Sequence, residues 1–136
     1  TSRSDHYARK KSEVIMISLE SFGDLSEIPA GKFEPKPTTL TEGQTEALVP
    51  LWESLDGLTK IGIWDCTIGH FTADRTKSAE ICHVLSGSAS VVNADGGGKR
   101  DIAAGDMLIL PIGWTGEWTI HEPMRKTYIL IAEAGI

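Results

Sequence analysis

From residue 58 onward the sequence is a succession of short apolar runs separated by turn-forming residues, and this spacing limits the folds open to the chain. Glycine and proline mark the breaks, most clearly in Asp95-Gly-Gly-Gly98 and Pro111-Ile-Gly113. Many short strands joined by glycine-rich turns are typical of a β-sandwich or a β-barrel. We therefore predict an all-β domain with strands at Ile61–Thr67, Phe71–Thr72, Glu80–Leu85, Ala89–Val92, Met107–Leu110, Trp118–Ile120 and Lys126–Ile131.

The first 57 residues have a different pattern. The run Val14–Ser18 is apolar and β-branched, which predicts a first strand. Prolines at four positions between residues 29 and 50 predict an extended arm over the barrel surface, and Pro50 interrupts the best helical segment, Thr45–Leu55. The expected organisation is a flexible basic tail (1–12), an N-terminal strand and arm (13–57) and a barrel core (58–136).

Charge and composition exclude several classes of protein. The formal net charge of −6 predicts repulsion from phosphate backbones, so nucleic acid is not an expected partner. No apolar run reaches the length of a membrane span and the start has no signal-peptide pattern, so we expect no membrane partner and a cytoplasmic location. The two cysteines, Cys66 and Cys82, are too few for a disulfide scaffold and are expected to be buried and reduced.

Two segments carry a recognisable pattern of turn residues. In Glu80–Gly87, six residues separate a glutamate from a glycine; in Gly105–Gly113, a glycine is followed after five residues by Pro-Ile-Gly. In this order, and seventeen residues apart, the segments resemble the two motifs of the cupin superfamily. The resemblance covers residues 58–132 and implies a single RmlC-like jelly-roll β-barrel with an N-terminal arm.

The resemblance also says where a cupin metal would be bound. Metal-binding cupins place a His-x-His pair before the glutamate and another histidine after the second motif. Here those positions hold Asp74 and Thr76, or Ala73 and Arg75, and then Gly116. Only Glu80 remains of the ligand set, and one carboxylate without imidazoles does not hold iron, manganese or zinc tightly. We therefore expect no metal ligands and no cofactor.

Further residues narrow the resemblance. They are Trp64, Asp65, Cys66, Gly69 and Phe71 before the first motif, and Trp114, Gly116, Trp118, Glu122, Arg125, Lys126 and Tyr128 after the second. This string resembles the cupin branch that groups the cupin domains of ureidoglycine aminohydrolases with the C-terminal domain of the ethanolamine-utilisation protein Q. True ureidoglycine aminohydrolases resemble metal-dependent bicupins, so the resemblance implies their fold and not their reaction.

Three residues are the candidates for catalysis: Glu80, Lys126 and Tyr128. Side chains alternate along a strand, so Glu80 shares an inward face with Cys82. In a pocket walled by tryptophan the pKa of Glu80 should rise, which would make it an acid–base group near neutrality. The alternative is a structural ion pair of Glu80 with Lys126 or an arginine. For Lys126 the other roles are an anchor for an anionic ligand or a solvent-exposed charge at the end of a strand. For Tyr128 the roles are a hydroxyl at the pocket wall or plain aromatic packing.

The candidates for ligand binding are Trp64, Cys66, Cys82, Trp114 and Trp118. The three tryptophans would form an aromatic wall for a small ligand, or they would fill the core. Cys82 would be a thiol nucleophile only if a histidine activated it. His83 adjoins Cys82 in sequence and faces the other side of the strand, which argues against a Cys–His pair.

Three functions remain open at this point. A metal-independent enzyme acting on a small polar amide, ureide, amine or acid would use Glu80 to move protons while Lys126 and Tyr128 orient the substrate. A non-catalytic binding or sensing module would hold the same kind of molecule. A metalloenzyme with unorthodox ligands would combine Glu80 with Asp74, His70 or the two cysteines.

We also expect a homodimer. The segment Val14–Ser18 and the outward-facing Ile81 and Leu85 are apolar and lack cover within one chain. Light scattering that gives a monomer mass at every protein concentration would contradict this expectation.

Overall fold

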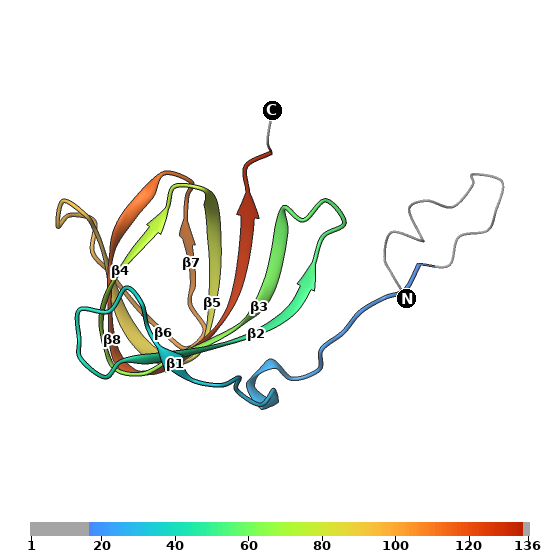
Figure 1. Cartoon of the computed structure of the whole chain (residues 1–136), viewed down its shortest axis with the longest axis horizontal. Coiled ribbons are helices and arrows are strands. Elements are labelled where there is room, and N and C mark those ends of the chain that lie inside the picture. Colours follow the sequence, from blue (N-terminus) through green and yellow to red (C-terminus); the bar gives the residue numbers. More distant parts are fainter. Residues whose placement is uncertain (1–16, 135–136) are drawn as a thin grey trace.

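The computed structural model, which describes residues 17–134, is an antiparallel β-barrel (Figure 1). It contains a short 3-10 helix and eight strands: η1 (Leu25–Glu27), β1 (Glu34–Pro35), β2 (Thr45–Glu53), β3 (Thr59–Cys66), β4 (Gly69–Arg75), β5 (Ser78–Asn93), β6 (Arg100–Ala103), β7 (Met107–Leu110) and β8 (Trp114–Ala132). The predicted all-β class is confirmed. Within residues 17–134, no helix is long and apolar enough to cross a membrane.

Two long strands, β5 and β8, organise the barrel. They pair with each other from Ser78 opposite Ala132 to Asn93 opposite Gly116. The first half of β8 also pairs with β4 and its second half with β3, while the first half of β5 pairs with β7 and its second half with β6. Each long strand therefore pairs with three others, β5 with β6, β7 and β8, and β8 with β3, β4 and β5.

The two long strands bend at the same place. Gly87 on β5 has a φ of +87°, and a Cβ atom there would lie 2.2 Å from the carbonyl oxygen of Pro123 on β8. The register between the strands shifts from Val84 to Ala89. The breaks expected here from the sequence are therefore bends inside continuous strands, and such bends turn the corners of a barrel.

Side-chain alternation decides what fills the barrel. On β5, Glu80, Cys82 and Val84 are buried and His83, between Cys82 and Val84, is exposed, so the predicted inward face is confirmed. Trp64 and Lys126 also point inward. The buried apolar cluster consists of Trp64, Cys66, Phe71, Cys82, Val84, Ala89, Val91, Ile102, Leu110, Trp118, Ile120 and Met124.

The segment considered as a helix, Thr45–Leu55, is a strand. Its residues Thr45–Glu53 form β2, which pairs with β3 from Glu46 opposite Cys66 to Glu53 opposite Lys60. Pro50 lies next to a register shift, and β1 covers only the first two residues of β2. The rest of β2 is therefore a sheet edge, where a proline without an N–H is tolerated.

The N-terminal arm contacts the barrel through η1. Arg125 on β8 donates hydrogen bonds to the carbonyl oxygens of Leu25 (3.0 Å) and Ile28 (2.6 Å). The predicted strand Val14–Ser18 begins outside the described residues, and its described part, Ile17 and Ser18, is not in a strand. The tail predicted for residues 1–12 lies outside the described residues as well.

The outward face of β7, β5, β8 and β3 carries a row of cross-strand neighbours, Ile109, Ile81, Ile129 and Ile61. Ile109 is 61% exposed. The expected homodimer stays a prediction, and we propose this face for the second copy. The face is apolar, whereas a net charge of −6 makes the remaining surfaces of two copies repel each other.

Candidate functional site

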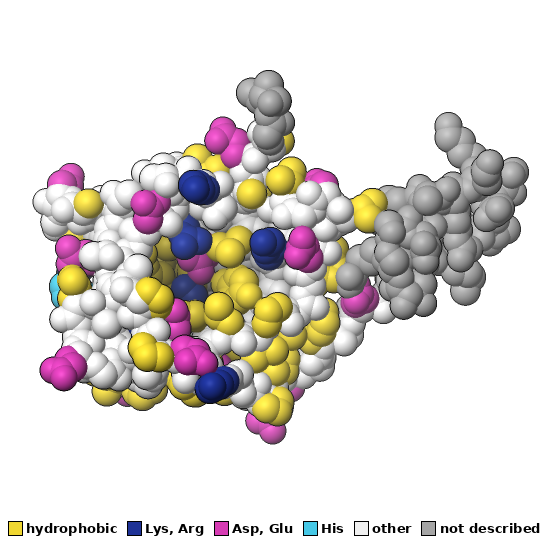
Figure 2. Space-filling view, viewed as in Figure 1, with side chains coloured by type: hydrophobic (Ala, Val, Ile, Leu, Met, Phe, Trp, Pro, Cys, Tyr) yellow, Lys and Arg dark blue, Asp and Glu magenta, His cyan; other side chains and the backbone are white. Residues whose placement is uncertain are grey.

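A cavity of about 400 Å³ lies inside the barrel. Its walls come from β2, β3, β4, β5 and β8, and from the turn that follows β1. Figure 2 shows a hollow in this face of the molecule, where basic and acidic side chains lie among apolar ones. Five residues predicted from the sequence line the cavity: Trp64, Glu80, Trp118, Lys126 and Tyr128.

A buried ion pair occupies the inner end of this cavity. The Lys126 ammonium lies 2.9 Å from one carboxylate oxygen of Glu80, and the two side chains are 6% and 10% exposed. Arg75 approaches the other oxygen of Glu80 at 3.8 Å. The alternative in which Glu80 pairs with Lys126 or an arginine is therefore confirmed, and both partners are present.

The expected rise in the pKa of Glu80 is wrong. Burial alone would raise this pKa, but the Lys126 ammonium and the Arg75 guanidinium more than offset burial and lower it. Burial would likewise lower the pKa of Lys126, and the Glu80 carboxylate reverses that effect and raises it. Both groups therefore stay charged around neutrality, and neither is suited to exchange a proton there.

The aromatic side chains form a packed cluster with lysines on their faces. Trp118 stacks on Phe71 with ring centroids 6.0 Å apart, and Trp64 meets both edge-on. The Lys126 ammonium lies 4.4 Å from the Trp64 ring centroid and 4.3 Å from that of Trp118. Lys36 lies 4.2 Å from the Phe71 centroid. These cation–π contacts cover ring faces that a ligand would otherwise use.

Trp114 lies away from the cavity. Its indole N–H donates to Asn93 Oδ1 at 2.9 Å, and its ring packs against Gly116. It therefore does not contribute to the aromatic wall expected from the sequence. Tyr128, in contrast, is positioned at the cavity by its cross-strand partner Gly62, where a Cβ atom would lie 2.3 Å from the Tyr128 hydroxyl.

The two cysteines are buried, free thiols that do not line the cavity. Burial raises the pKa of Cys66 to about 11 and that of Cys82 to about 12. Cys82 lies beneath the ion pair and interacts with Glu80 and Lys126, while His83 is exposed on the other side of β5. Neither thiol is therefore a nucleophile near neutrality.

Residues 53–128 match the family model of the EutQ-like cupin domain. The chain belongs to this family. The predicted cupin fold and the predicted branch of the ethanolamine-utilisation protein Q are both confirmed. None of the curated proteins matches this cupin.

Several solved structures are similar to this cupin. The ethanolamine utilization protein Q of Salmonella typhimurium is 23% identical, with 66% of this chain and 72% of that chain covered and a TM-score of 0.57. A DUF861 family protein of unknown function from Pseudomonas syringae is 19% identical, with 75% and 43% covered and a TM-score of 0.63. At these identities the likeness shows the fold alone.

The residues at the cupin metal positions do not fit a metal ion. Arg75 brings a positive charge to one histidine position, and the Asp74 carboxylate accepts a hydrogen bond from the Thr76 N–H at 2.7 Å. A Cβ atom at Gly116 would lie 2.2 Å from the carbonyl oxygen of Val92, so a histidine does not fit there. Among residues 17–134, no group of three His, Cys, Asp or Glu side chains could hold a metal ion.

We accordingly expect less than stoichiometric transition metal in the isolated protein. Glu80 is already paired with Lys126, and one carboxylate leaves most of a metal shell to water. Elemental analysis of untagged protein from cells grown with added manganese, iron, nickel and zinc tests this. About one metal ion per chain, lost in a Glu80→Gln variant, would show that an unorthodox site exists.

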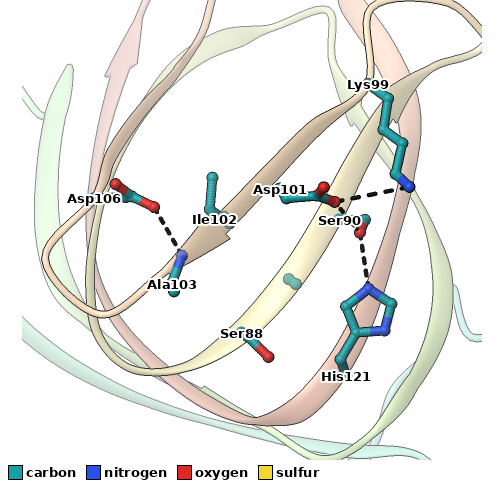
Figure 3. A pocket seen from close by; sticks show the side chains of 9 residues that line it. Ser88, Ser90, Lys99, Asp101, Ile102, Ala103, Asp106 and His121 are labelled. Carbon is teal, nitrogen blue, oxygen red and sulfur yellow. Dashed lines mark hydrogen bonds and ion pairs between the residues drawn. The ribbon is translucent and has the colours of Figure 1, made fainter.

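A second hollow, on the outside of the barrel, brings a serine, a histidine and an aspartate together (Figure 3). The Ser90 hydroxyl lies 2.6 Å from Asp101 Oδ1 and 2.7 Å from His121 Nε2. Its hydrogen bond to Asp101 lowers the pKa of that carboxyl, so the serine proton goes to the carboxylate. His121 then donates to Ser90 rather than accepting its proton, which is the reverse of what a serine nucleophile needs.

The sequence did not identify three charged residues of the cavity. Arg75 was noted only as the occupant of a former histidine position. Lys36 and Glu46, 2.8 Å apart, come from the segment assigned to the arm, and Glu46 also accepts a hydrogen bond from the Trp64 indole at 2.8 Å. The sequence signal for Glu46 was its two-residue spacing from Leu48, which places both side chains on one face of a strand. Pro50 obscured this signal because a proline argues against a regular strand.

Proposed function

We propose that this cupin binds a small polar molecule in the barrel cavity and does not use Glu80 for proton transfer. The observation that carries the proposal is the buried pair of Glu80 and Lys126 at the inner end of a 400 Å³ cavity. Because the pKa of Glu80 is lowered and that of Lys126 is raised, the pair keeps its charges at neutral pH. Such a fixed pair supports recognition better than acid–base catalysis.

Tyr128 supports the same proposal. It lines the cavity, and burial together with the nearby Glu80 carboxylate raises its pKa. Its hydroxyl therefore keeps its proton around neutrality and is available to donate a hydrogen bond to a ligand. The enzyme hypothesis uses Glu80 as acid–base group and Lys126 and Tyr128 to orient the substrate. None of these three groups has its pKa moved toward neutrality, where an acid–base group would need it.

Closing the mouth of the cavity tests the proposal. Leu48 lines the cavity and is 52% exposed, so a Leu48→Trp substitution is expected to block the entrance without disturbing the core. Leu55→Trp is the matched control, because Leu55 is 50% exposed and lies outside the cavity. Ligand-observed NMR would compare both variants with the natural protein against small acids, amides, ureides and amines.

At least one of these classes is expected to bind the natural protein and Leu55→Trp, and to lose binding in Leu48→Trp. If no class binds the natural protein, or if Leu48→Trp binds as well as the control, the cavity is not the binding site. Chemical conversion of a bound compound that stops in a Glu80→Gln variant shown to be folded and to bind the compound would favour the enzyme hypothesis instead.

A further inference from the structure

We propose that the ligand of this cavity is a small organic carboxylate and that the guanidinium of Arg75 binds it. This inference rests on the proposed function and names the class of molecule that the cavity takes. Arg75 is the last residue of β4 and lines the cavity with a side chain that is 25% exposed. A ligand entering the cavity can therefore reach it.

The hydrogen-bond donors of Arg75 are unused. A guanidinium carries five N–H donors. Among the described residues, the Arg75 side chain makes no hydrogen bond, its buried Nε has no partner, and its single ion pair, to Glu80, is long at 3.8 Å. A buried N–H donor without an acceptor is costly, and a carboxylate bound to Nε and a terminal nitrogen of Arg75 would remove that cost.

Arg125, on the outside of the same barrel, provides a comparison, because its guanidinium nitrogens all have hydrogen-bond acceptors. Its guanidinium binds both carboxylate oxygens of Asp65, at 2.8 and 3.1 Å, and its remaining nitrogen donates to the carbonyl oxygen of Ile28 at 2.6 Å. This fork-to-fork geometry is the one in which arginine recognises a carboxylate. Arg75 has the same donors and no such acceptor among residues 17–134.

The carboxylates inside the cavity leave Arg75 without a close partner. Lys36 pairs with Glu46 at 2.8 Å and Lys126 with Glu80 at 2.9 Å. The remaining carboxylate that lines the cavity, Asp74, is exposed and accepts a hydrogen bond from the Thr76 N–H, and within residues 17–134 the ion pair of Arg75 is the long one to Glu80. A ligand carboxylate would supply the close partner that Arg75 lacks.

The same arrangement disfavours a cationic ligand. The aromatic faces that would attract a cation already carry Lys36 and Lys126, at 4.2 to 4.4 Å from the ring centroids. A third cation would also meet the charge of Arg75. The Tyr128 hydroxyl is left to donate to a second polar group of the same ligand.

The test compares acids with their own amides. Titration calorimetry of the full chain would use short-chain monocarboxylates, the primary amide of each, and inorganic phosphate as probes. At least one acid is expected to bind, about tenfold or more tightly than its amide, because a hydrogen bond to a charged group contributes more than one between neutral groups. Arg75→Gln is expected to remove that preference, and Arg75→Lys, which keeps the charge without the fork, to weaken acid binding less than Arg75→Gln.

Arg100→Gln is the matched control, since Arg100 is exposed on β6 and, within residues 17–134, its side chain bonds only to the Lys99 carbonyl oxygen at 3.0 Å. The inference is overturned if amides bind as tightly as acids, if phosphate binds more tightly than any acid, or if folded Arg75→Gln or Arg75→Lys keeps the full acid preference. Amide binding that Leu48→Trp abolishes would leave the proposed function standing while this inference fails. If neither acids nor amides bind, this inference fails, and the proposed function fails with it only if ureides and amines do not bind either.

Discussion

Replacing Glu80 by glutamine is expected to lower the free energy of unfolding by about 3–5 kcal/mol, because it leaves the Lys126 ammonium buried without a counter-charge. The Lys126 side chain is only 6% exposed, and Glu80 is its ion-pair partner at 2.9 Å. Arg75, the other charged group close to Glu80, would then repel Lys126. Urea denaturation followed by tryptophan fluorescence measures the change.

A double-mutant cycle separates the ion pair from simple loss of packing. Lys126→Met should cost less than Glu80→Gln, because Arg75 still balances Glu80. The double variant should be more stable than the sum of the two losses predicts, with a coupling energy of about 2–3 kcal/mol. Additive losses would mean that the two charges do not stabilise each other.

A solvent-exposed ion pair provides the control. Lys32 and Glu34 lie 3.5 Å apart with side chains 86% and 60% exposed, so Glu34→Gln should leave stability nearly unchanged. A loss in Glu34→Gln that equals the loss in Glu80→Gln would show that burial of the pair is not what matters.

The effect of Glu80→Gln should depend on pH in a defined direction. A lowered pKa in the folded state stabilises the fold above the ordinary value of 4.5, and this contribution disappears as the pH falls through the lowered pKa. The difference between the natural protein and Glu80→Gln should therefore be constant near neutrality and shrink in acid. The raised pKa of Lys126 adds stability that is complete below its ordinary value of 10.5 and is lost as the pH rises through the raised value.

The sequence predicted the barrel because local rules decide it. Turn glycines predicted the strand class, two-residue alternation placed Glu80 and Cys82 on one face, and the cupin resemblance implied that this face points inward; the structure agrees with all three. The strand β2 was missed because its segment, Thr45–Leu55, was identified only as the best helical candidate, interrupted by Pro50, within an extended arm. Pairing with β3 makes the segment a strand, and a register shift next to Pro50 accommodates the proline.

The charge state of the site could not be predicted from local rules. Lys126 lies far from Glu80 in the chain, and only the pairing of β5 with β8 brings them together. The sequence suggested this partner as an alternative, but it could not weigh the attraction against the burial that raises a carboxylate pKa. Glu46 and Lys36 were missed for the same reason, since their place at the cavity depends on how β1 and β2 join the sheet.

Replacing Gly87 by alanine is expected to destabilise the fold strongly. Gly87 has a φ of +87°, where a Cβ atom costs about 1–2 kcal/mol, and that atom would lie 2.2 Å from the Pro123 carbonyl oxygen and 2.7 Å from Met124 Cα. These are backbone atoms of β8 that cannot rotate away. We expect a total loss of about 3–5 kcal/mol in the free energy of unfolding.

Gly105 is the matched control, because it begins the second motif, has a φ of +96° and has no atom within 4 Å of its Cβ position. Gly105→Ala should therefore show the conformational cost alone, about 1–2 kcal/mol in urea denaturation. Equal losses at the two positions would mean that β8 yields to the added methyl group at the bend. A larger loss at Gly87 would show that the glycine of the first motif is required by the close approach of β5 and β8, whereas Gly105 is required only by its turn.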